Sequence, residues 1–231
     1  MKKAIIISMA AALVMAGMVL SAFAREGSRC KATDKVCRDF EALADAEQFE
    51  AIAGKVDKSG KYSEGSRHYI GRAYLALAAS ENNTPQQEEA FCRKALEFGA
   101  SQAYMGLYFI HVRENEEKAL GYLREYVKTK PADSVPYVIL GESELGKKNY
   151  HLADAYLREA KRLSRANSPG VDWMLFQANY LLGNYQYASE VLDRALKNGN
   201  GRFEQELRML SSDARFQGIA KRPEFRNMIP G

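Results

Sequence analysis

Runs of aromatic and aliphatic residues recur along this chain at a spacing of about 35 residues. Gly71, Gly106 and Gly141 lie at this spacing, each inside such a run, and the same step leads from Gly141 to Phe176. Self-similarity at a period of about 20 to 50 residues is typical of chains built from stacked structural repeats. The pattern therefore predicts an array of similar units.

Small and apolar residues form a second pattern after the last two of these runs. Its members are Ala153, Leu157 and Ala160, followed one period later by Ala188, Leu192 and Ala195. Small residues at helical spacing let two helix axes approach closely, while larger ones fill the gaps. No stretch from 61 to 199 keeps the two-residue alternation of a half-buried strand for long. Each unit is predicted to be a helix, a turn and a second helix, and the chain to be all-α.

Several helix boundaries are indicated by residue type. Thr84 offers a capping hydroxyl, Pro85 suits a first helical turn, and Gln87 stands three residues after the cap. Serine and proline are combined in the same way at Ser134 with Pro136 and at Ser168 with Pro169. Gly99 and Gly199 follow helical stretches, where glycine can take the left-handed conformation that ends a helix.

The third and fourth units resemble the tetratricopeptide repeat. In the third unit the matching residues are Tyr137, Leu140, Gly141, Asn149, Tyr150, Ala153, Leu157 and Ala160. In the fourth they are Trp173, Leu175, Gly183, Asn184, Tyr185, Ala188, Leu192 and Ala195. The first unit has a long internal turn, SENNTPQQ, and a short exit, EFGAS, and it is similar to the related Sel1-like repeat. The resemblance covers 61–199 and implies a right-handed α-solenoid of about four stacked helix-turn-helix repeats.

Two flanking segments complete the expected organisation. Residues 25–60 are predicted to form an N-terminal helical segment. Residues 200–231 resemble the tail often seen after such arrays, with a helix, an Asp-x-x-Phe turn and a Pro-x-Phe turn. We expect this C-terminal capping segment to cover the open apolar face of the last repeat.

The first 24 residues have the pattern of a cleavable signal peptide. Lys2 and Lys3 precede a long apolar run, and Ala22 and Ala24 supply small residues at the two positions that a leader peptidase reads. Cleavage after Ala24 would send the mature chain to the periplasm or out of the cell. The alternative is a retained membrane anchor, although Gly17 and the many alanines suit a cleavable segment better.

The charge balance bears on the class of partner. The whole chain carries 33 Lys and Arg residues against 29 Asp and Glu, a formal net charge of +4, and loss of Lys2 and Lys3 would lower it further. Nucleic acid binding requires a concentrated basic face, so this balance argues against such a partner. No apolar run after the signal is long enough to span a membrane.

Three cysteines become informative if the chain is exported. On an uninterrupted helix Cys30 and Cys37 would lie about 10.5 Å apart, beyond the usual 4.4–6.8 Å between bridged Cα atoms, so a bridge requires a non-helical start. Thr33 or Asp34 could cap a helix that begins after Cys30. The two residues form either a disulfide or two unpaired thiols. Cys92 lies among second-helix packing residues and is expected to be a small buried hydrophobe.

No catalytic or cofactor motif is complete. The segment 141–148 resembles a phosphate loop, but Lys148 stands where Ser or Thr should hold magnesium, and the preceding run is helical. The histidines His68, His111 and His151 come from different units without metal-ligand spacing. We therefore expect no catalytic residue, no metal and no cofactor.

The repeat resemblance also implies a binding face. First helices of stacked repeats line the concave side of the superhelix, which commonly holds an extended peptide or a partner helix. The partner-binding residues expected there are His68, Arg72, Glu142, Trp173, Gln177 and Tyr180. Leu75, Leu107 and Ile110 lie on the same helices and are at least as well suited to the core. Trp173, the only tryptophan, serves either core packing or a binding hot spot.

Two classes of function remain. The first is an exported, non-enzymatic repeat scaffold that binds a protein or peptide partner in the cell envelope through its concave face. The alternative is a secreted Sel1-like enzyme or binder that acts on cell-wall-related compounds. Proteins of that kind carry a cysteine pair in nearly every repeat, whereas the repeats of this chain carry only Cys92. This departure favours the scaffold.

Overall fold

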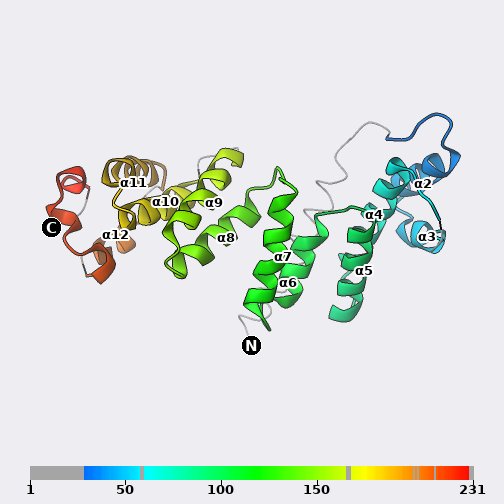
Figure 1. Cartoon of the computed structure of the whole chain (residues 1–231), viewed down its shortest axis with the longest axis horizontal. Helices are drawn as coiled ribbons and strands as arrows, with labels where there is room; N and C mark the ends of the chain where they lie inside the picture. The colour runs from blue at the N-terminus through cyan, green and yellow to red at the C-terminus, as the bar shows by residue number, and fades with distance from the viewer. Residues whose placement is uncertain are drawn as a thin grey trace. The chain divides into compact units, whose positions relative to one another are not determined.

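The computed structural model describes residues 29–57, 60–164, 168–199, 201, 203–210 and 212–228. Throughout these residues the regular structure is helical and no strand is present, which confirms the predicted all-α class (Figure 1). The predicted signal peptide, residues 1–24, lies outside the described residues. The chain divides into two compact units, of which the first ends at Thr129 and the second begins at Lys130.

In the first unit each helix packs against its neighbour in sequence. The helices are α2 (Lys35–Asp45), α3 (Phe49–Gly54), α4 (Glu64–Ala78), α5 (Pro85–Glu97), α6 (Ala103–His111) and α7 (Glu116–Lys128). Helix α4 contacts α2, α3 and α5, after which α5 packs on α6 and α6 on α7. One buried cluster includes Phe40 and Ile70, and a second includes Cys92 and Leu107. Helix α4 contributes to both clusters, so it is the central element of this unit.

The second unit continues the pairwise packing and ends in short turns. Its elements are α8 (Val135–Gly146), α9 (Tyr150–Leu163), α10 (Pro169–Leu181), α11 (Tyr185–Gly199), α12 (Glu204–Leu210), and the 3-10 turns η1 (Ala214–Phe216), η2 (Ile219–Lys221) and η3 (Pro223–Phe225). Helix α9 lies between α8 and α10, and α10 packs on α11. The turns η1 and η3 contact α10 and α11 respectively.

The periodic residues of the sequence are buried. Gly71, Gly106, Gly141 and Phe176 lie on α4, α6, α8 and α10. The small and apolar set of the second pattern is fully buried on α9 and α11: Ala153, Leu157, Ala160, Ala188, Leu192 and Ala195. These positions therefore have the packing role that their spacing predicts.

The predicted helix starts are confirmed, with one difference in chemistry. At α5 the Thr84 hydroxyl accepts a hydrogen bond from the backbone N–H of Gln87 at 3.3 Å, and the Gln87 side chain accepts one from the N–H of Thr84 at 2.8 Å. This reciprocal pair satisfies donors that a helix N-terminus otherwise leaves open. Helices α8 and α10 begin directly after Ser134 and Ser168, but neither serine side chain caps its helix. At α8 the carboxylate of Asp133 instead accepts a hydrogen bond from the backbone N–H of Val135, the first residue of the helix.

Two glycines were predicted to end helices in the left-handed conformation; the prediction is correct for Gly99 and wrong for Gly199. Gly99 has a φ of 88° directly after α5 and its C-cap residue. Gly199 is instead the last residue of α11, and the left-handed conformation falls on Gly201, with a φ of 80°. Gly199 and Gly201 can both adopt a positive φ without steric cost. Because Gly201 adopts it here, α11 extends through Gly199.

The C-terminal segment packs on α10. Phe216 closes the Asp-x-x-Phe turn η1 and Phe225 closes the Pro-x-Phe turn η3, and both side chains are buried. Aromatic contacts join this segment to α10, with Trp173 against Phe203 at 4.9 Å between ring centroids, and with Phe176 and Tyr180 each against both Phe216 and Phe225 at 5.0–6.0 Å. The segment thus packs its aromatic side chains against those of α10.

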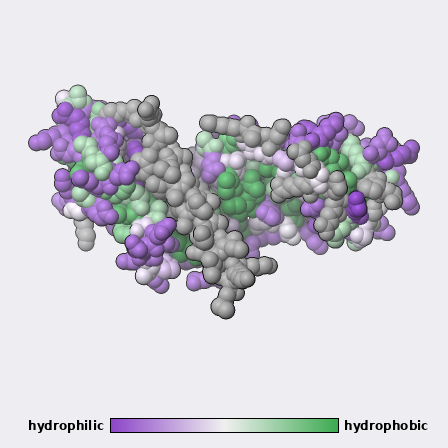
Figure 2. Space-filling view, turned by 180° about the vertical axis from the view of Figure 1, so that it is seen from behind, coloured by the Kyte–Doolittle hydropathy of each residue, from purple (hydrophilic) through white to green (hydrophobic). Residues whose placement is uncertain are grey.

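The described surface is mainly polar. Its large hydrophobic side chains that are exposed are Val36, Val135, Leu152 and Met209, and they lie on four different helices. Figure 2 shows hydrophilic residues over much of the coloured surface, with hydrophobic residues in patches between them. No helix within the described residues is long and apolar enough to span a membrane.

Candidate binding pocket

A basic pocket lies in the first unit, between α4 and the segment that leads from α5 into α6. It has a volume of about 390 Å³. Its lining residues are Arg29, Glu64, Arg67, His68, Arg72, Leu75, Phe98, Gly99, Ala100, Ser101 and Gln102. Three arginines against one glutamate give the lining a net positive charge, and its size is within the range of ligand pockets, about 300–1,000 Å³.

One face of α4 forms the main wall of the pocket. The lining residues of this helix follow one another at mostly helical spacing: Glu64, Arg67, His68, Arg72 and Leu75. Glu64 and Arg67 are exposed, His68 and Arg72 are half-buried, and Leu75 is buried. The wall therefore changes from charged at one end to apolar at the other.

A glycine lets the opposite wall approach this helix. A Cβ atom added at Gly71 would lie 3.0 Å from the Cβ of Ala100, which is closer than ordinary van der Waals contact. The left-handed Gly99 turns the chain toward α4 at the same point. The first glycine of the periodic pattern therefore also determines how close the 98–102 segment comes to the helix.

Two of the arginines are positioned by neighbouring groups. Arg67 donates a hydrogen bond from Nη2 to the carbonyl oxygen of Glu97 at 2.5 Å, and its guanidinium carbon lies 5.5 Å from the ring centroid of Phe98. The guanidinium carbon of Arg72 lies 5.8 Å from the ring centroid of Tyr69. Such contacts hold the planar guanidinium groups and reduce the entropy that they lose on binding a ligand.

The turn before α6 completes this wall. Ser101 and Gln102 line the pocket immediately before Ala103, the first residue of α6. The backbone N–H groups of Ala103, Tyr104 and Met105 donate hydrogen bonds to carbonyl oxygens of the preceding turn, at 3.0–3.1 Å. These donors are therefore paired within the chain, and the positive charge of the lining comes from its arginines.

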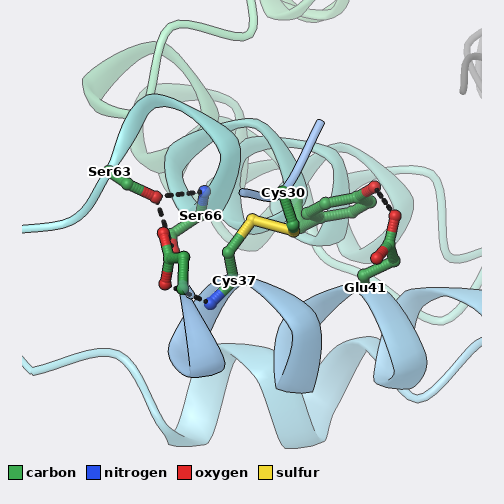
Figure 3. Close-up of a disulfide and its surroundings, with 7 residues drawn as sticks. Cys30, Cys37, Glu41, Ser63 and Ser66 are labelled. Atoms are coloured by element: carbon green, nitrogen blue, oxygen red, sulfur yellow. Dashed lines mark hydrogen bonds between the residues drawn. A yellow bond between two sulfur atoms is a disulfide. The ribbon is translucent and has the colours of Figure 1, made fainter. Parts of the chain in front are cut away.

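A disulfide fixes the chain just before α2 (Figure 3). Cys30 is bonded to Cys37, with 5.5 Å between their Cα atoms. Asp34 caps the helix that starts at Lys35, because its carboxylate accepts a hydrogen bond from the N–H of Cys37 at 2.9 Å. Cys30 precedes the helix and folds back, which is the non-helical start that a bridge requires. Hydrogen bonds from Ser63 and from the Cys37 backbone hold the pKa of Asp34 below its ordinary value.

The same bridge holds Arg29 at the pocket. Arg29 directly precedes Cys30, and its carbonyl group lies against Gly65 at the start of α4. A Cβ atom added at Gly65 would lie 2.7 Å from this carbonyl oxygen and 2.6 Å from the Sγ atom of Cys37. The backbone of Arg29 also forms a hydrogen bond with Tyr69. The disulfide thus brings a third arginine to the pocket, in addition to the two that α4 supplies.

A hydrogen bond next to the bridge joins α2 to α4. The Tyr69 hydroxyl donates to Oε1 of Glu41 at 2.6 Å (Figure 3). Burial, followed by this hydrogen bond, raises the pKa of Tyr69 to about 12. The phenol therefore remains a protonated donor at neutral pH, and it supports the helix that carries the pocket.

The structure brings together two of the six predicted partner-binding residues. His68 and Arg72 both line the pocket. The other four belong to the second unit, where Glu142 is exposed and Gln177 is half-buried. Trp173 and Tyr180 are buried beneath the C-terminal segment, with exposed fractions of 9% and 6%, so the structure gives them a packing role.

Three charged residues of the pocket were missed by the sequence analysis. Glu64 lies four residues before His68, and Arg67 directly precedes His68 on the same helix. Glu64 lies at helical spacing from both His68 and Arg67, so the sequence does contain a signal for Glu64 and Arg67. Arg29 carries no local signal, because the disulfide brings it to α4 from another part of the sequence.

The second unit has a more open hollow whose polar groups contact one another. The hollow has a volume of about 620 Å³. Within it, Arg158 lies over the ring of Tyr187 at 4.3 Å, and Asn179 donates a hydrogen bond to Asp154 at 2.6 Å. Its lining carries one arginine against Glu190 and Glu224, so it lacks the positive charge of the pocket on α4 and is a weaker candidate for binding an anionic ligand.

The remaining reactive side chains have structural surroundings. Cys92 is fully buried, as predicted, and burial raises the pKa of its thiol to about 12. His111 is stacked on Tyr122 with 5.6 Å between ring centroids, and its Nε2 atom lies 3.3 Å from a carboxylate oxygen of Glu89. Within the part of the chain that the structure describes, no group of three or more His, Cys, Asp or Glu residues could hold a metal ion.

Comparison with known proteins adds no assignment. No family model matches this chain, and no curated protein matches its sequence.

Proposed function

We propose that this chain is an exported, non-enzymatic scaffold that binds a protein or peptide partner in the cell envelope. The observation that carries the proposal is the basic pocket on α4, which combines positioned cations with an apolar floor. The two residues His68 and Arg72, which the repeat resemblance assigns to the binding face, both line this pocket. Concave surfaces with a few placed polar groups are typical of binding sites.

In this proposal the helix pairs α4 and α5, α6 and α7, α8 and α9, and α10 and α11 are successive tetratricopeptide or Sel1-like repeats. They form a right-handed α-solenoid whose first helices contribute the binding face. The buried small residues that recur every 35 residues or so support this arrangement. Glu142 and Gln177 would add contacts from the third and fourth repeats.

The proposed export rests on the N-terminal pattern and on the disulfide. Disulfides persist mainly in oxidising compartments, so the Cys30–Cys37 bridge supports a periplasmic or secreted location. Mass spectrometry of the protein purified from its native envelope should find Arg25 at the N-terminus. Recovery of a chain that still begins with Met1 would instead indicate a retained anchor.

The binding function is tested by crosslinked capture with a matched variant. Tagged wild-type chain and the double variant Arg67→Glu, Arg72→Glu are expressed equally and crosslinked in intact cells. We expect a partner that is recovered with the wild-type chain and lost with the variant, while the melting temperatures stay similar because Arg67 is exposed and Arg72 is half-buried. Equal recovery of every captured protein with both chains would rule out the pocket as the binding site.

A thermal-shift comparison separates the scaffold from the alternative that acts on cell-wall-related compounds. A ligand that binds only the folded state raises the melting temperature by mass action. We expect peptides to raise it and soluble wall fragments to leave it unchanged. A rise with wall fragments alone would contradict the scaffold proposal.

A further inference from the structure

We infer that the pocket on α4 binds the carboxylate groups of an acidic peptide segment, and that Arg29 determines affinity because the disulfide positions it there. This inference rests on the proposed peptide-binding function and specifies the chemistry of the ligand. It has two parts, the charge of the pocket and the origin of its third cation.

The charge of the lining favours a carboxylate ligand. Arg29, Arg67 and Arg72 line the pocket and come from two separate segments of the chain. A guanidinium group presents its N–H donors in a planar fork that matches the two oxygens of a carboxylate. Glu64 is the one acidic side chain of the lining, and it opposes the binding of an anion.

The apolar part of the lining favours a peptide over a free inorganic anion. Leu75, Phe98 and Ala100 line the same pocket as the arginines. An acidic peptide brings methylene groups and neighbouring side chains that can cover these atoms, in addition to its carboxylates. A small inorganic anion would occupy only a fraction of the available 390 Å³ or so.

The disulfide matters because Arg29 lies outside any helix. Arg29 precedes α2 by several residues, and its position depends on the bridge next to it and on the close contact of its carbonyl group with Gly65. Without the bridge, the segment before α2 loses its covalent link to Cys37. Arg29 would then spend less time at the pocket, and binding would weaken through that residue.

The ligand chemistry is tested with two fluorescent peptides, one of alternating aspartate and leucine and the other with asparagine in place of aspartate. We expect the aspartate peptide to bind more tightly, and its affinity to fall as salt is added. Arg67→Gln and Arg72→Gln should each reduce the affinity roughly tenfold or more, since hydrogen bonds to charged groups are the strong ones. Glu64→Gln should increase it by roughly twofold to fivefold, since a nearby negative charge is removed.

Arg38→Gln is the matched control, because Arg38 is an exposed arginine of the same unit and does not line the pocket. It makes the same change in net charge and should leave the affinity unchanged. Equal loss in the Arg38 variant would mean that the peptide responds only to overall charge and would overturn the pocket assignment. Equal binding of both peptides, or displacement by inorganic phosphate at equal concentration, would overturn the acidic peptide as ligand.

A double-mutant cycle tests the role of the disulfide. Arg29→Gln alone and the pair Cys30→Ser, Cys37→Ser should weaken binding by similar factors, and the triple variant should bind no more weakly than either. Circular dichroism and the melting temperature identify any variant that has unfolded, and Arg29→Gln is at an exposed position that should tolerate the change. Wild-type affinity in Arg29→Gln, or fully additive losses in the triple variant, would overturn the role of Arg29.

These results can be separated from the test of the proposed function. If a partner is captured through Arg67 and Arg72 but the aspartate peptide does not bind, the inference about carboxylates is wrong and the scaffold function stands. If no partner depends on the pocket and the peptide also fails to bind, both are wrong.

Discussion

Helices α4 and α10 carry corresponding positions three periods apart, but their environments are opposite. Stepping along the chain by about 35 residues three times relates Gly71 of α4 to Phe176 of α10. At Gly71 the missing side chain lets the 98–102 segment form the wall of an open pocket. At Phe176 a large ring is fully buried against Phe216 of the C-terminal segment. Both positions are buried, but the one on α4 lies beside an open pocket, whereas the one on α10 lies beneath the C-terminal segment.

Neighbouring positions show the same contrast. Arg67 lies four residues before Gly71, and Asp172 lies four residues before Phe176. Arg67 is exposed in the pocket, whereas Asp172 is fully buried. The carboxylate of Asp172 accepts from Lys161 at 2.8 Å and lies 3.4 Å from Arg194, so it joins α9, α10 and α11. Covering a helix face therefore changes the surroundings of its charged groups: they remain accessible where the face is open and form buried ion pairs where it is closed.

The largest expected effect is on the covered face. Phe176→Ala should lower the free energy of unfolding of the second unit by about 3–5 kcal/mol, because it removes a fully buried ring and leaves a cavity. Denaturation in urea, followed by the fluorescence of Trp173, measures this directly, since the only tryptophan lies in the same unit and is stacked on Phe203.

The matched change on the open face is Arg72→Ala, which should alter the free energy of unfolding by about 1 kcal/mol or less, because the half-buried side chain loses its contact with the Tyr69 ring but leaves no large cavity. Since Arg72 lies in the first unit, its unfolding is followed by circular dichroism. If Arg72→Ala proved as costly as Phe176→Ala, the distinction between an open and a covered face would be wrong.

A second effect concerns the buried carboxylate. Asp172→Ala should destabilise the second unit by about 3 kcal/mol, because it leaves Lys161 and Arg194 without the charge that they contact. The loss should be at the low end for a buried ion pair, because both cations are partly exposed and can be solvated when the carboxylate is removed. At the corresponding exposed position, Arg67→Ala should cost almost nothing. Chemical denaturation of the two variants compares the positions, and equal losses would contradict the contrast.

The contacts between paired helices should be equally close in both units, whereas the faces of α4 and α10 described above differ. Ala95 on α5 and Ala160 on α9 are both fully buried at second-helix positions. Ala95→Leu and Ala160→Leu should each destabilise by about 1–3 kcal/mol, since extra methylene groups cannot fit where helices approach closely. Thermal unfolding of both variants is the measurement. A stable Ala160→Leu protein would show that the helix faces assigned to this contact are wrong.

The smallest effect is expected at Cys92, which reports on the first unit. Because its thiol is buried and its pKa is raised to about 12, the native protein at about pH 8 should resist alkylation, whereas the unfolded chain should react. The raised pKa favours the folded state below the ordinary thiol pKa, and this contribution is lost as pH rises toward 12. Mass spectrometry after labelling should therefore find Cys92 modified only once the protein unfolds. Rapid native labelling would mean that the core around α5 opens easily.

The helical architecture was predictable because it depends on local patterns. Each helix can be placed from signals within a few residues, such as the capping residue Thr84 before α5. The apolar runs around Gly71, Gly106 and Gly141 then show that similar helices recur along the chain. The left-handed residue after α11 was wrongly predicted at Gly199, which is the last residue of the helix, because Gly199 and Gly201 carry the same signal and only the folded structure selects one of them.

The pocket was predictable only in part. The repeat resemblance assigned His68 and Arg72 to the binding face, whereas Arg29 reaches the pocket through a disulfide whose formation the sequence left open. An aromatic side chain such as Trp173 has the same helical spacing whether a partner or the chain's own tail covers it. That choice depends on contacts between distant segments, which spacing within one helix does not report.

The contact between Gly65 and the disulfide places a constraint on how this sequence can change during evolution. A side chain at position 65 would collide with both the Sγ atom of Cys37 and the carbonyl group of Arg29. Glycine is required there only while the bridge holds these atoms against α4. In related chains, the cysteine pair and the glycine should therefore be gained and lost together, and a lineage that loses the bridge should be free to place a larger residue at position 65.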